Sequence, residues 1–105
     1  MTDFLTQWIE ADRARSERIE AGLREGRRRA ATLEAEVESP DGGVRVRIGS
    51  DKRLVELHLE EKVYQEYDED TLAMAVMATY TAARQRLGRK RRDAINRALG
   101  MTEDI

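Results

Sequence analysis

The stretch that most constrains this chain runs from Thr32 to Glu60, where apolar and polar residues alternate. A period of two places successive side chains on opposite faces of a β-strand. The alternation stops twice, at residues 39–43 and at residues 49–52. Three alternating runs joined by two turns predict an antiparallel meander with one apolar and one polar face. We expect its strands at about residues 32–38, 44–49 and 53–60.

Charged side chains of both signs fall on the polar face of this predicted sheet. Two arginines of the second strand alternate outward, and glutamates of the first and third strands lie on either side. Opposite charges across strands each contribute roughly a few tenths of a kcal/mol and help to fix the register. We therefore interpret this face as a salt-bridged solvent face rather than a DNA-binding surface. Its residues are Glu34, Glu36, Glu38, Arg45, Arg47 and Glu56.

Long helices are predicted before and after the sheet in the chain, and both are expected to cover its apolar face, so the fold class is α+β with the order α-β-β-β-α. The first helix covers about residues 3–30 and the second about residues 69–99, with Asp68 as the N-cap of the second. Residues 61–67 are expected to connect the sheet to the second helix, and residues 100–105 to form a tail. The stripe predicted to pack the second helix on the sheet consists of Leu72, Val76, Tyr80, Ala83 and Leu87.

The first helix is longer than the sheet that it accompanies, because its 28 residues would make a rod of roughly 42 Å. We expect part of it to project beyond the sheet or to meet a second subunit. Its apolar stripe is interrupted at Asp12 and Ser16, and Gly22 and Gly26 lie on one side. Two interpretations of the glycines remain open: they allow another backbone to approach closely, or they weaken the helix. The candidate dimer-interface residues are Leu5, Trp8, Ile9, Ile19 and Leu23.

The composition predicts one small domain, residues 1–105, that gains stability from a partner. The chain has 38% charged and 40% hydrophobic residues and a net charge of −2, and a small sheet with two helices buries little apolar surface alone. The absence of cysteine excludes disulfides, thiolate zinc sites and thiol nucleophiles. No run is apolar enough to span a membrane and the N-terminus does not resemble a signal peptide. We therefore expect a cytoplasmic protein.

Several motifs together resemble those of a known family. Residues 37–49 have the sequence VESPDGGVRVRIG, and a third strand and a helix with regularly spaced apolar residues follow. The matching residues are Val37, Glu38, Ser39, Asp41, Gly42, Val44, Val46, Ile48, Gly49, Leu54, Val55, Leu57, Leu59, Leu72, Val76, Ala82 and Ala83. Over about residues 25–95 the chain resembles the YbaB/EbfC family of bacterial nucleoid-associated proteins, and it is most similar to divergent actinobacterial members. The resemblance implies an α-β-β-β-α fold, an intertwined homodimer and DNA binding.

Two basic clusters remain after the sheet arginines are set aside, one at the end of the first helix and one in the second helix. Arginine suits phosphate because its planar fork makes bidentate contacts. Several such contacts would give a steep salt dependence and little sequence preference. The alternative is that these arginines solvate the helices, some paired with Glu20, Glu25 or Asp93. The candidate DNA-binding residues are Arg24, Arg27, Arg28, Arg29, Arg84, Arg89, Lys90, Arg91 and Arg92.

A catalytic role has little support, and we expect a non-enzymatic protein without a metal ion or cofactor. The single histidine, His58, alternates outward on the third strand as a surface residue. The acidic residues at 68–70 are explained by the start of a helix, where the helix dipole favours negative charge. No glycine-rich phosphate loop follows a strand.

These observations predict a homodimeric, nucleoid-associated protein that binds double-stranded DNA with weak sequence preference. The alternative is a protein-interaction adaptor or chaperone-like dimer of the same fold, for example one associated with a secretion system. The negative net charge and the acid-paired face of the sheet favour this alternative. The expected partners are therefore double-stranded DNA and a second copy of the chain, or another protein under the alternative, with no membrane involved.

Overall fold

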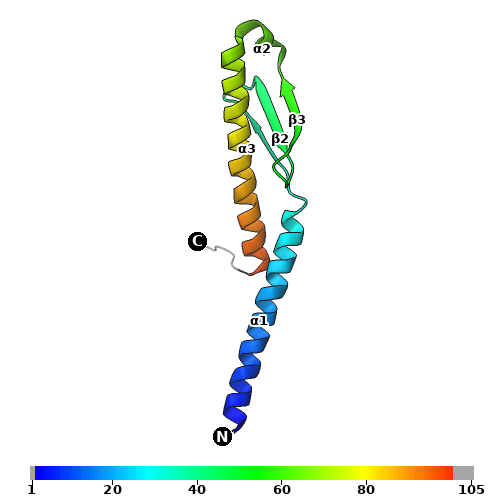
Figure 1. Ribbon diagram of the computed structural model, residues 1–105, viewed down its shortest axis with the longest axis vertical. Coiled ribbons are helices and arrows are strands. Elements are labelled where there is room, and N and C mark those ends of the chain that lie inside the picture. Colours follow the sequence, from blue (N-terminus) through cyan, green and yellow to red (C-terminus); the bar gives the residue numbers. More distant parts are fainter. Residues whose placement is uncertain (1, 101–105) are drawn as a thin grey trace.

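The computed structural model describes residues 2–100 and shows an elongated molecule of 80 × 27 × 17 Å. Figure 1 shows a body made of a sheet and one long helix, from which a second long helix extends toward the N-terminus. The α+β class and the α-β-β-β-α order are confirmed, with one short helix added. The elements are α1 (Thr2–Ala30), β1 (Ala35–Glu38), β2 (Val44–Ile48), β3 (Leu54–Leu59), α2 (Glu61–Glu66) and α3 (Glu69–Ala98).

The strands form an antiparallel sheet in the order β1-β2-β3, as the two turns predicted. In the middle strand, Val46 pairs with Val37 of β1 on one side and with Leu57 of β3 on the other. Residues that pair directly across strands share a face. These three side chains therefore mark the apolar face of the sheet.

The regular alternation of β3 is broken near its start. Arg47 pairs with Glu56, whereas the next residue of β2, Ile48, pairs with Leu54. Val55 is thus an extra residue in the strand, as in a β-bulge. The bulge lets both Leu54 and Leu57 lie on the apolar side despite their odd spacing.

Asp41 closes the turn between β1 and β2. Its carboxylate accepts hydrogen bonds from the hydroxyl of Tyr67, from the Gly43 N–H at 2.9 Å and from Ser39 Oγ at 2.9 Å. These hydrogen bonds, that of Tyr67 foremost, lower the pKa of Asp41 to about 2. Gly42 adopts a φ of 73°, which costs glycine no strain. Because Tyr67 directly precedes Asp68, the N-cap of α3, Asp41 joins the first turn to the segment that positions that helix.

α3 packs along the apolar face of the sheet, over β1 and β2. Its first residues are capped as predicted, since Asp68 accepts a hydrogen bond from the Thr71 N–H at 2.7 Å. The apolar side of β3 is left uncovered, and Leu54 and Leu57 are 51% and 41% exposed. The core beneath α3 consists of Ala35, Val44, Val46, Ile48, Ala83 and Leu87.

α1 meets α3 only near its C-terminal end, at two glycines. A Cβ on Gly22 would lie 2.9 Å from the carbonyl oxygen of Ala98, and a Cβ on Gly26 would lie 3.0 Å from Cα of Ile95. A side chain at either position would force the helices apart. Of the two interpretations of these glycines, close approach of another backbone is therefore the one that the structure shows.

The bounds of the strands differ from those predicted, most clearly in the first strand. β1 begins at Ala35 rather than at residue 32, because the chain leaves α1 through a turn in which the Leu33 N–H donates to the Ala30 carbonyl at 3.3 Å. The remaining ends of β2, β3 and α3 lie within one residue of the prediction.

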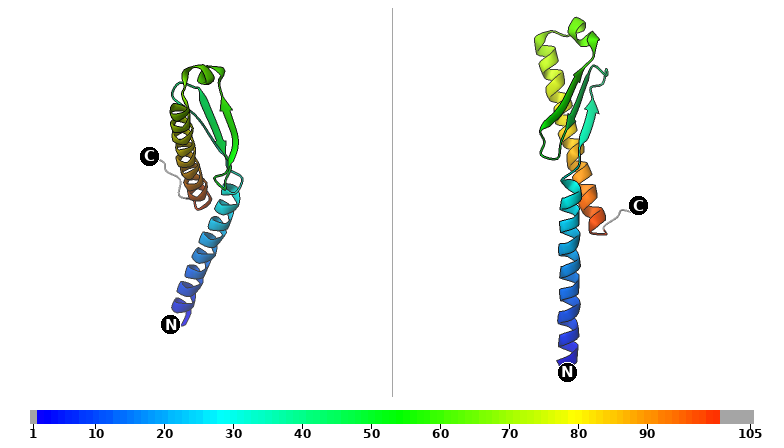
Figure 2. Two further views of the ribbon diagram at one scale, coloured as in Figure 1. Left: turned by 45° about the horizontal axis from the view of Figure 1, so that its top comes forward. Right: turned by 90° about the vertical axis from the view of Figure 1, so that its right-hand side faces the viewer.

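Two further expectations need correction. Residues 61–66, which were expected only to connect the sheet to the second helix, form the helix α2, and its Val63 is buried against Gly43 of the first turn. α1 does not cover the apolar face of the sheet. Its residues 3–21 are exposed, and Figure 2 shows the helix running away from the body in both views. α3 is thus the long helix that covers the sheet.

Candidate nucleic-acid interface

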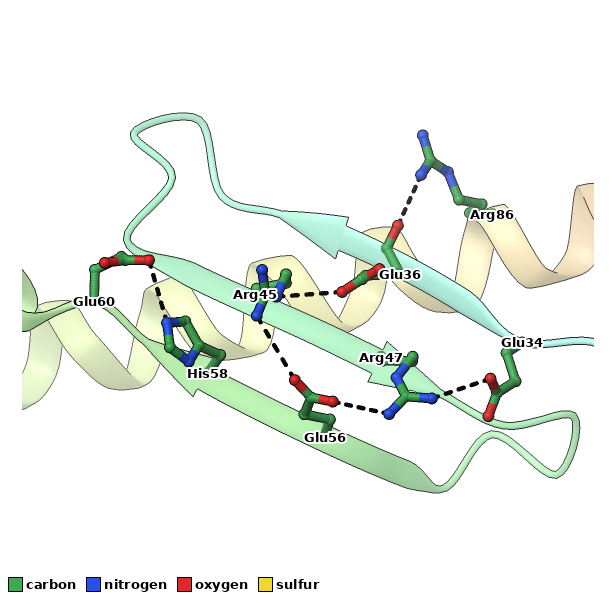
Figure 3. Close-up of polar contacts among 8 residues, drawn as sticks. All are labelled: Glu34, Glu36, Arg45, Arg47, Glu56, His58, Glu60 and Arg86. Atoms are coloured by element: carbon green, nitrogen blue, oxygen red, sulfur yellow. Dashed lines mark hydrogen bonds and ion pairs between the residues drawn. The ribbon is translucent and has the colours of Figure 1, made fainter.

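The polar face of the sheet holds its arginines in ion pairs, as Figure 3 shows. Arg47 donates hydrogen bonds to Glu34 at 3.2 Å and to Glu56 at 2.8 Å. Arg45 lies between Glu36 and Glu56, with N–O distances of 3.2 and 3.7 Å, although its Nε forms no hydrogen bond. The predicted salt-bridged solvent face is confirmed for these five residues.

These ion pairs join two arginines to three glutamates, so the charge of the arginines is fully compensated. The hydrogen bond from Arg47 lowers the pKa of Glu56, and Glu56 and Glu34 raise the pKa of Arg47. The Glu56 carboxylate therefore remains ionised at neutral pH. Glu38 is in no salt bridge among residues 2–100. A phosphate approaching this face would meet carboxylates already bound to both arginines, so the face is a poor site for DNA.

The two basic clusters of the sequence come together at the middle of the molecule. α1 and α3 run antiparallel and touch where Gly26 meets Ile95, so the end of α1 lies next to the basic part of α3. We call residues 24–29 and 84–92 the basic waist. It contains ten cationic side chains and one carboxylate, that of Glu25.

Two cations of the waist connect α3 to the sheet. Arg86 Nη1 donates to the backbone carbonyl of Glu36 at 2.7 Å, and Lys90 Nζ donates to that of Glu34 at 2.9 Å. The two residues lie four apart and so share one side of the helix. Because carbonyl oxygens carry no formal charge, these contacts position both cations without neutralising them.

Another side of α3 forms a shallow pocket of about 380 Å³ with the turn between β2 and β3. Arg84 lies over the ring of Tyr80, 6.0 Å from its centroid, and the Tyr80 hydroxyl donates to the Lys52 carbonyl at 2.7 Å. Within residues 2–100, neither Lys52, Arg84 nor Arg91 makes a salt bridge. The pocket therefore presents three uncompensated positive charges. Its lining consists of Lys52, Thr81, Arg84, Gln85, Leu87, Gly88 and Arg91.

The α1 part of the waist is partly neutralised. Arg28 and Arg29 both pair with Glu25, at 2.5 and 2.9 Å, and their hydrogen bonds lower the pKa of that carboxyl group. Arg24 and Arg27 are exposed and line a second shallow pocket together with Glu20 and Leu23. On α1, these two arginines are the better candidates for an anionic ligand.

The opposite end of α3 is acidic. Residues 60–70, which comprise α2 and the first turn of α3, contain six carboxylates and one lysine, Lys62. α3 therefore carries negative charge at its start and positive charge over its second half. Since fields of opposite sign orient a charged partner, a polyanion is attracted to the waist and repelled from this end. The carboxylates belong to Glu60, Glu61, Glu66, Asp68, Glu69 and Asp70.

The other candidate residues lie outside the waist. The apolar residues predicted for a dimer interface lie along α1, where Trp8 is 64% exposed and Leu23 is half-buried near α3. His58 is exposed on the polar face, 3.2 Å from Glu60. Among residues 2–100, no group of acidic residues and histidine could hold a metal ion, and no helix is both long and apolar enough to cross a membrane.

A comparison with known protein families shows to which family this chain belongs. The model of the YbaB/EbfC DNA-binding family matches residues 13–102. The chain belongs to this family. The resemblance inferred from the turn and strand motifs is thereby confirmed, and the family is one of DNA-binding proteins. A search of curated proteins gave no match.

The YbaB/EbfC fold also brings one residue to the waist that sequence reasoning missed. Lys52 lies in the second turn, with a φ of 69°, and packs beside the middle of α3. The sequence placed this residue in a polar turn but gave no sign of its neighbour. The position of Lys52 could have been inferred from the expected packing of the second helix on the sheet, because this packing brings one of the turns close to that helix.

Proposed function

We propose that a homodimer of this protein binds double-stranded DNA in the nucleoid through the basic waist, without catalysis and with little sequence preference. The observation that carries this proposal is the meeting of two basic clusters at the Gly26–Ile95 contact, in a chain whose net charge is −2. A single family match supports DNA as the anionic partner.

The chemistry of the waist favours recognition of the DNA backbone. Arg84 and Arg91 present planar guanidinium groups that can bind phosphate oxygens in a bidentate manner. Contacts to phosphate fix the position of a protein on the duplex but carry no sequence information. A binding surface made of arginines around two helices therefore discriminates poorly between sequences.

The homodimer part of the proposal rests on the uncovered side of β3. Leu57 lies on the same face as Val46, which is fully buried, yet Leu57 itself is 41% exposed because α3 covers only β1 and β2. Leu54, which pairs with the buried Ile48, extends this apolar strip along the strand. Covering it with the same strip of a second copy would bury the apolar surface on both chains and bring two basic waists into one particle.

DNA binding is tested by fluorescence anisotropy with two duplexes of unrelated sequence over a range of salt concentrations. We expect similar dissociation constants for both duplexes, in the micromolar range, and a steep fall in affinity with salt. Absence of binding to any duplex at about 50 mM salt would overturn the proposal. A large preference for one duplex would overturn the claim of weak sequence preference.

The dimer is tested by comparing Leu57→Lys with His58→Lys in light scattering coupled to size-exclusion chromatography. The two substitutions add the same residue to adjacent positions of β3, but on opposite faces of the sheet. We expect Leu57→Lys to prevent pairing through β3 and His58→Lys to preserve it. Equal masses for the two variants would show that β3 is not a dimer interface.

The alternative function is that of an adaptor or chaperone-like protein. In that case the apolar strip on β3 would bind another protein. This alternative would be supported if nuclease-treated protein bound no duplex and the wild-type protein were a monomer. Those two results together would replace the DNA-binding proposal.

A further inference from the structure

The N-terminal part of α1 is a helical arm that leaves the body of the molecule. Residues 3–21 are all exposed, and an arm of this length extends about 28 Å. Most of the stability of a helix in a protein comes from packing its apolar face against another element. The arm nevertheless exposes large apolar side chains: Leu5 by 60%, Trp8 by 64% and Ile19 by 49%.

The apolar side of the arm continues the side of α1 that contacts α3. Ile19 precedes Gly22 by three residues and Gly26 by seven, so the three positions lie on one side of the helix. α3 ends opposite Gly22, where Ala98 makes its contact. Beyond that point, no described element covers the same side of α1.

Two charged residues interrupt the apolar stripe at its centre. If Leu5 occupies position a of a heptad, the a and d positions are filled in order by Leu5, Trp8, Asp12, Arg15, Ile19 and Gly22. Asp12 and Arg15 therefore take the central a and d positions. Neither side chain is in a salt bridge among residues 2–100.

We propose that the arms of two copies of this chain pair as an antiparallel coiled coil. In an antiparallel pair, each a position faces a d position of the other helix. One register then places Trp8 against Ile19 of the second copy and Asp12 against Arg15 of the second copy. The two-fold axis repeats both contacts, so the interrupted stripe becomes two apolar layers on either side of two ion pairs.

The charges select this arrangement over a parallel one. A parallel pair in register places Asp12 against Asp12 and Arg15 against Arg15, and like charges that face each other oppose association. Beside the seam, the antiparallel register brings Ile9 close to Ser16 and Ala11 close to Arg18, so no like charges meet there. The sequence of the arm is thus complementary to itself in one orientation.

This contact is separate from the proposed DNA-binding function. It uses neither the basic waist nor β3, and the family match begins only at Arg13, so Leu5, Trp8 and Asp12 lie outside it. If the β3 strips also pair, the arms would join one dimer to the next. The contact would then allow proteins bound at different places on DNA to be linked.

Charge reversal tests the pairing by light scattering in a Leu57→Lys background, where contact through β3 is removed. With intact arms we expect a dimer, and either Asp12→Arg or Arg15→Asp should weaken it at least about tenfold. A mixture of these two variants should regain the dimer, because the mixed pair again has opposite charges at both layers. The matched control is Glu10→Arg, on the opposite side of the arm, which should not change the mass.

Three results of this experiment would overturn the proposal. They are a monomer with intact arms, a dimer that Asp12→Arg weakens no more than Glu10→Arg, and a mixture that does not recover. Each result concerns the arms alone, since no DNA is present. If the DNA-binding proposal is wrong, adding the protein to labelled duplex will instead leave the fluorescence anisotropy unchanged.

Orientation is tested with cysteines, which the natural chain lacks. The antiparallel register predicts that a mixture of Trp8→Cys and Ile19→Cys proteins forms an intermolecular disulfide under mild oxidation, and that neither variant does so alone. In that register the two positions 8 are about 16 Å apart. Efficient cross-linking of Trp8→Cys with itself would indicate a parallel pair and overturn the proposed orientation.

Discussion

The polar face of the sheet and the basic waist both contain arginines, but their surroundings differ. On the sheet, the cross-strand neighbours of Arg45 and Arg47 in β1 are the glutamates Glu38 and Glu36, and both arginines are in ion pairs. In the waist, Arg84 and Arg91 lie on a helix stretch, residues 84–92, that contains no acidic residue. The number of arginines alone therefore does not identify a surface for an anionic partner.

The difference follows from how each element places its neighbours. Each residue of a strand lies opposite a residue of the neighbouring strand. Opposite charges at such paired positions stabilise the sheet, and like charges destabilise it. A helix surface is exposed to solvent on most sides, and its charges can remain unpaired. Unpaired arginines are therefore expected on α3 and on the end of α1, where a polyanion could neutralise them.

The largest expected effect comes from removing charge at the waist. Replacement of Arg84, Arg91 and Arg92 by glutamine should weaken duplex binding about 100-fold at low salt, because three phosphate contacts per protomer are lost. The slope of log affinity against log salt should decrease by about 3 for each protomer. Anisotropy titrations at several salt concentrations provide both values, and an unchanged slope would refute a role of these residues.

The next effect concerns the contact that brings the basic clusters together. Gly26→Leu places a side chain where Ile95 already lies within 3.0 Å of a Cβ, so it should destabilise the fold by about 1–3 kcal/mol in urea unfolding. Duplex binding should weaken several-fold as the clusters separate. The control for the stability measurement is Gly88→Ala, whose Cβ meets nothing within 4 Å and which should stabilise α3 by up to about 1 kcal/mol.

A smaller effect is expected at Asp41, in the turn between β1 and β2. The pKa of Asp41 lies at about 2 in the folded chain, below the 3.8 of an unperturbed aspartate. Its contribution to stability is thus fully present above pH 3.8 and is lost as the pH falls toward 2. Asp41→Asn should therefore be less stable than wild type at pH 5, with a difference that narrows toward pH 2. Urea midpoints measured across this range test the prediction, and a constant difference would contradict it.

The smallest effect is predicted for the sheet arginines. Replacement by glutamine of Arg45 and Arg47 in β2, and of Arg53 in the turn before β3, changes the net charge as much as the waist variant does, yet it should weaken duplex binding less than about threefold. Each of these arginines is in a salt bridge with an acidic residue. Equal losses for the sheet and waist variants would mean that net charge, and not the waist, governs DNA binding.

The strand pattern and the turns were predictable because their signals are local. Alternation of Val44, Val46 and Ile48 with Arg45 and Arg47 determines which side chains are buried, and the aspartate and glycines of residues 39–43 determine a reversal. The cap of α3 at Asp68 is equally local. The start of β1 and the helix α2 were missed, because both depend on short hydrogen-bonded turns that the apolar pattern does not reveal.

The sequence by itself determined the order of the elements, the two faces of the sheet and the existence of two basic clusters. Only the tertiary structure decided that Gly22 and Gly26 let α1 approach α3, that the clusters meet there, and that Lys52 joins Arg84. It also decided that α1 leaves the sheet and exposes Trp8. The physical reason is that periodicity states which side of an element is apolar, whereas the partner of that side depends on contacts between residues far apart in the chain.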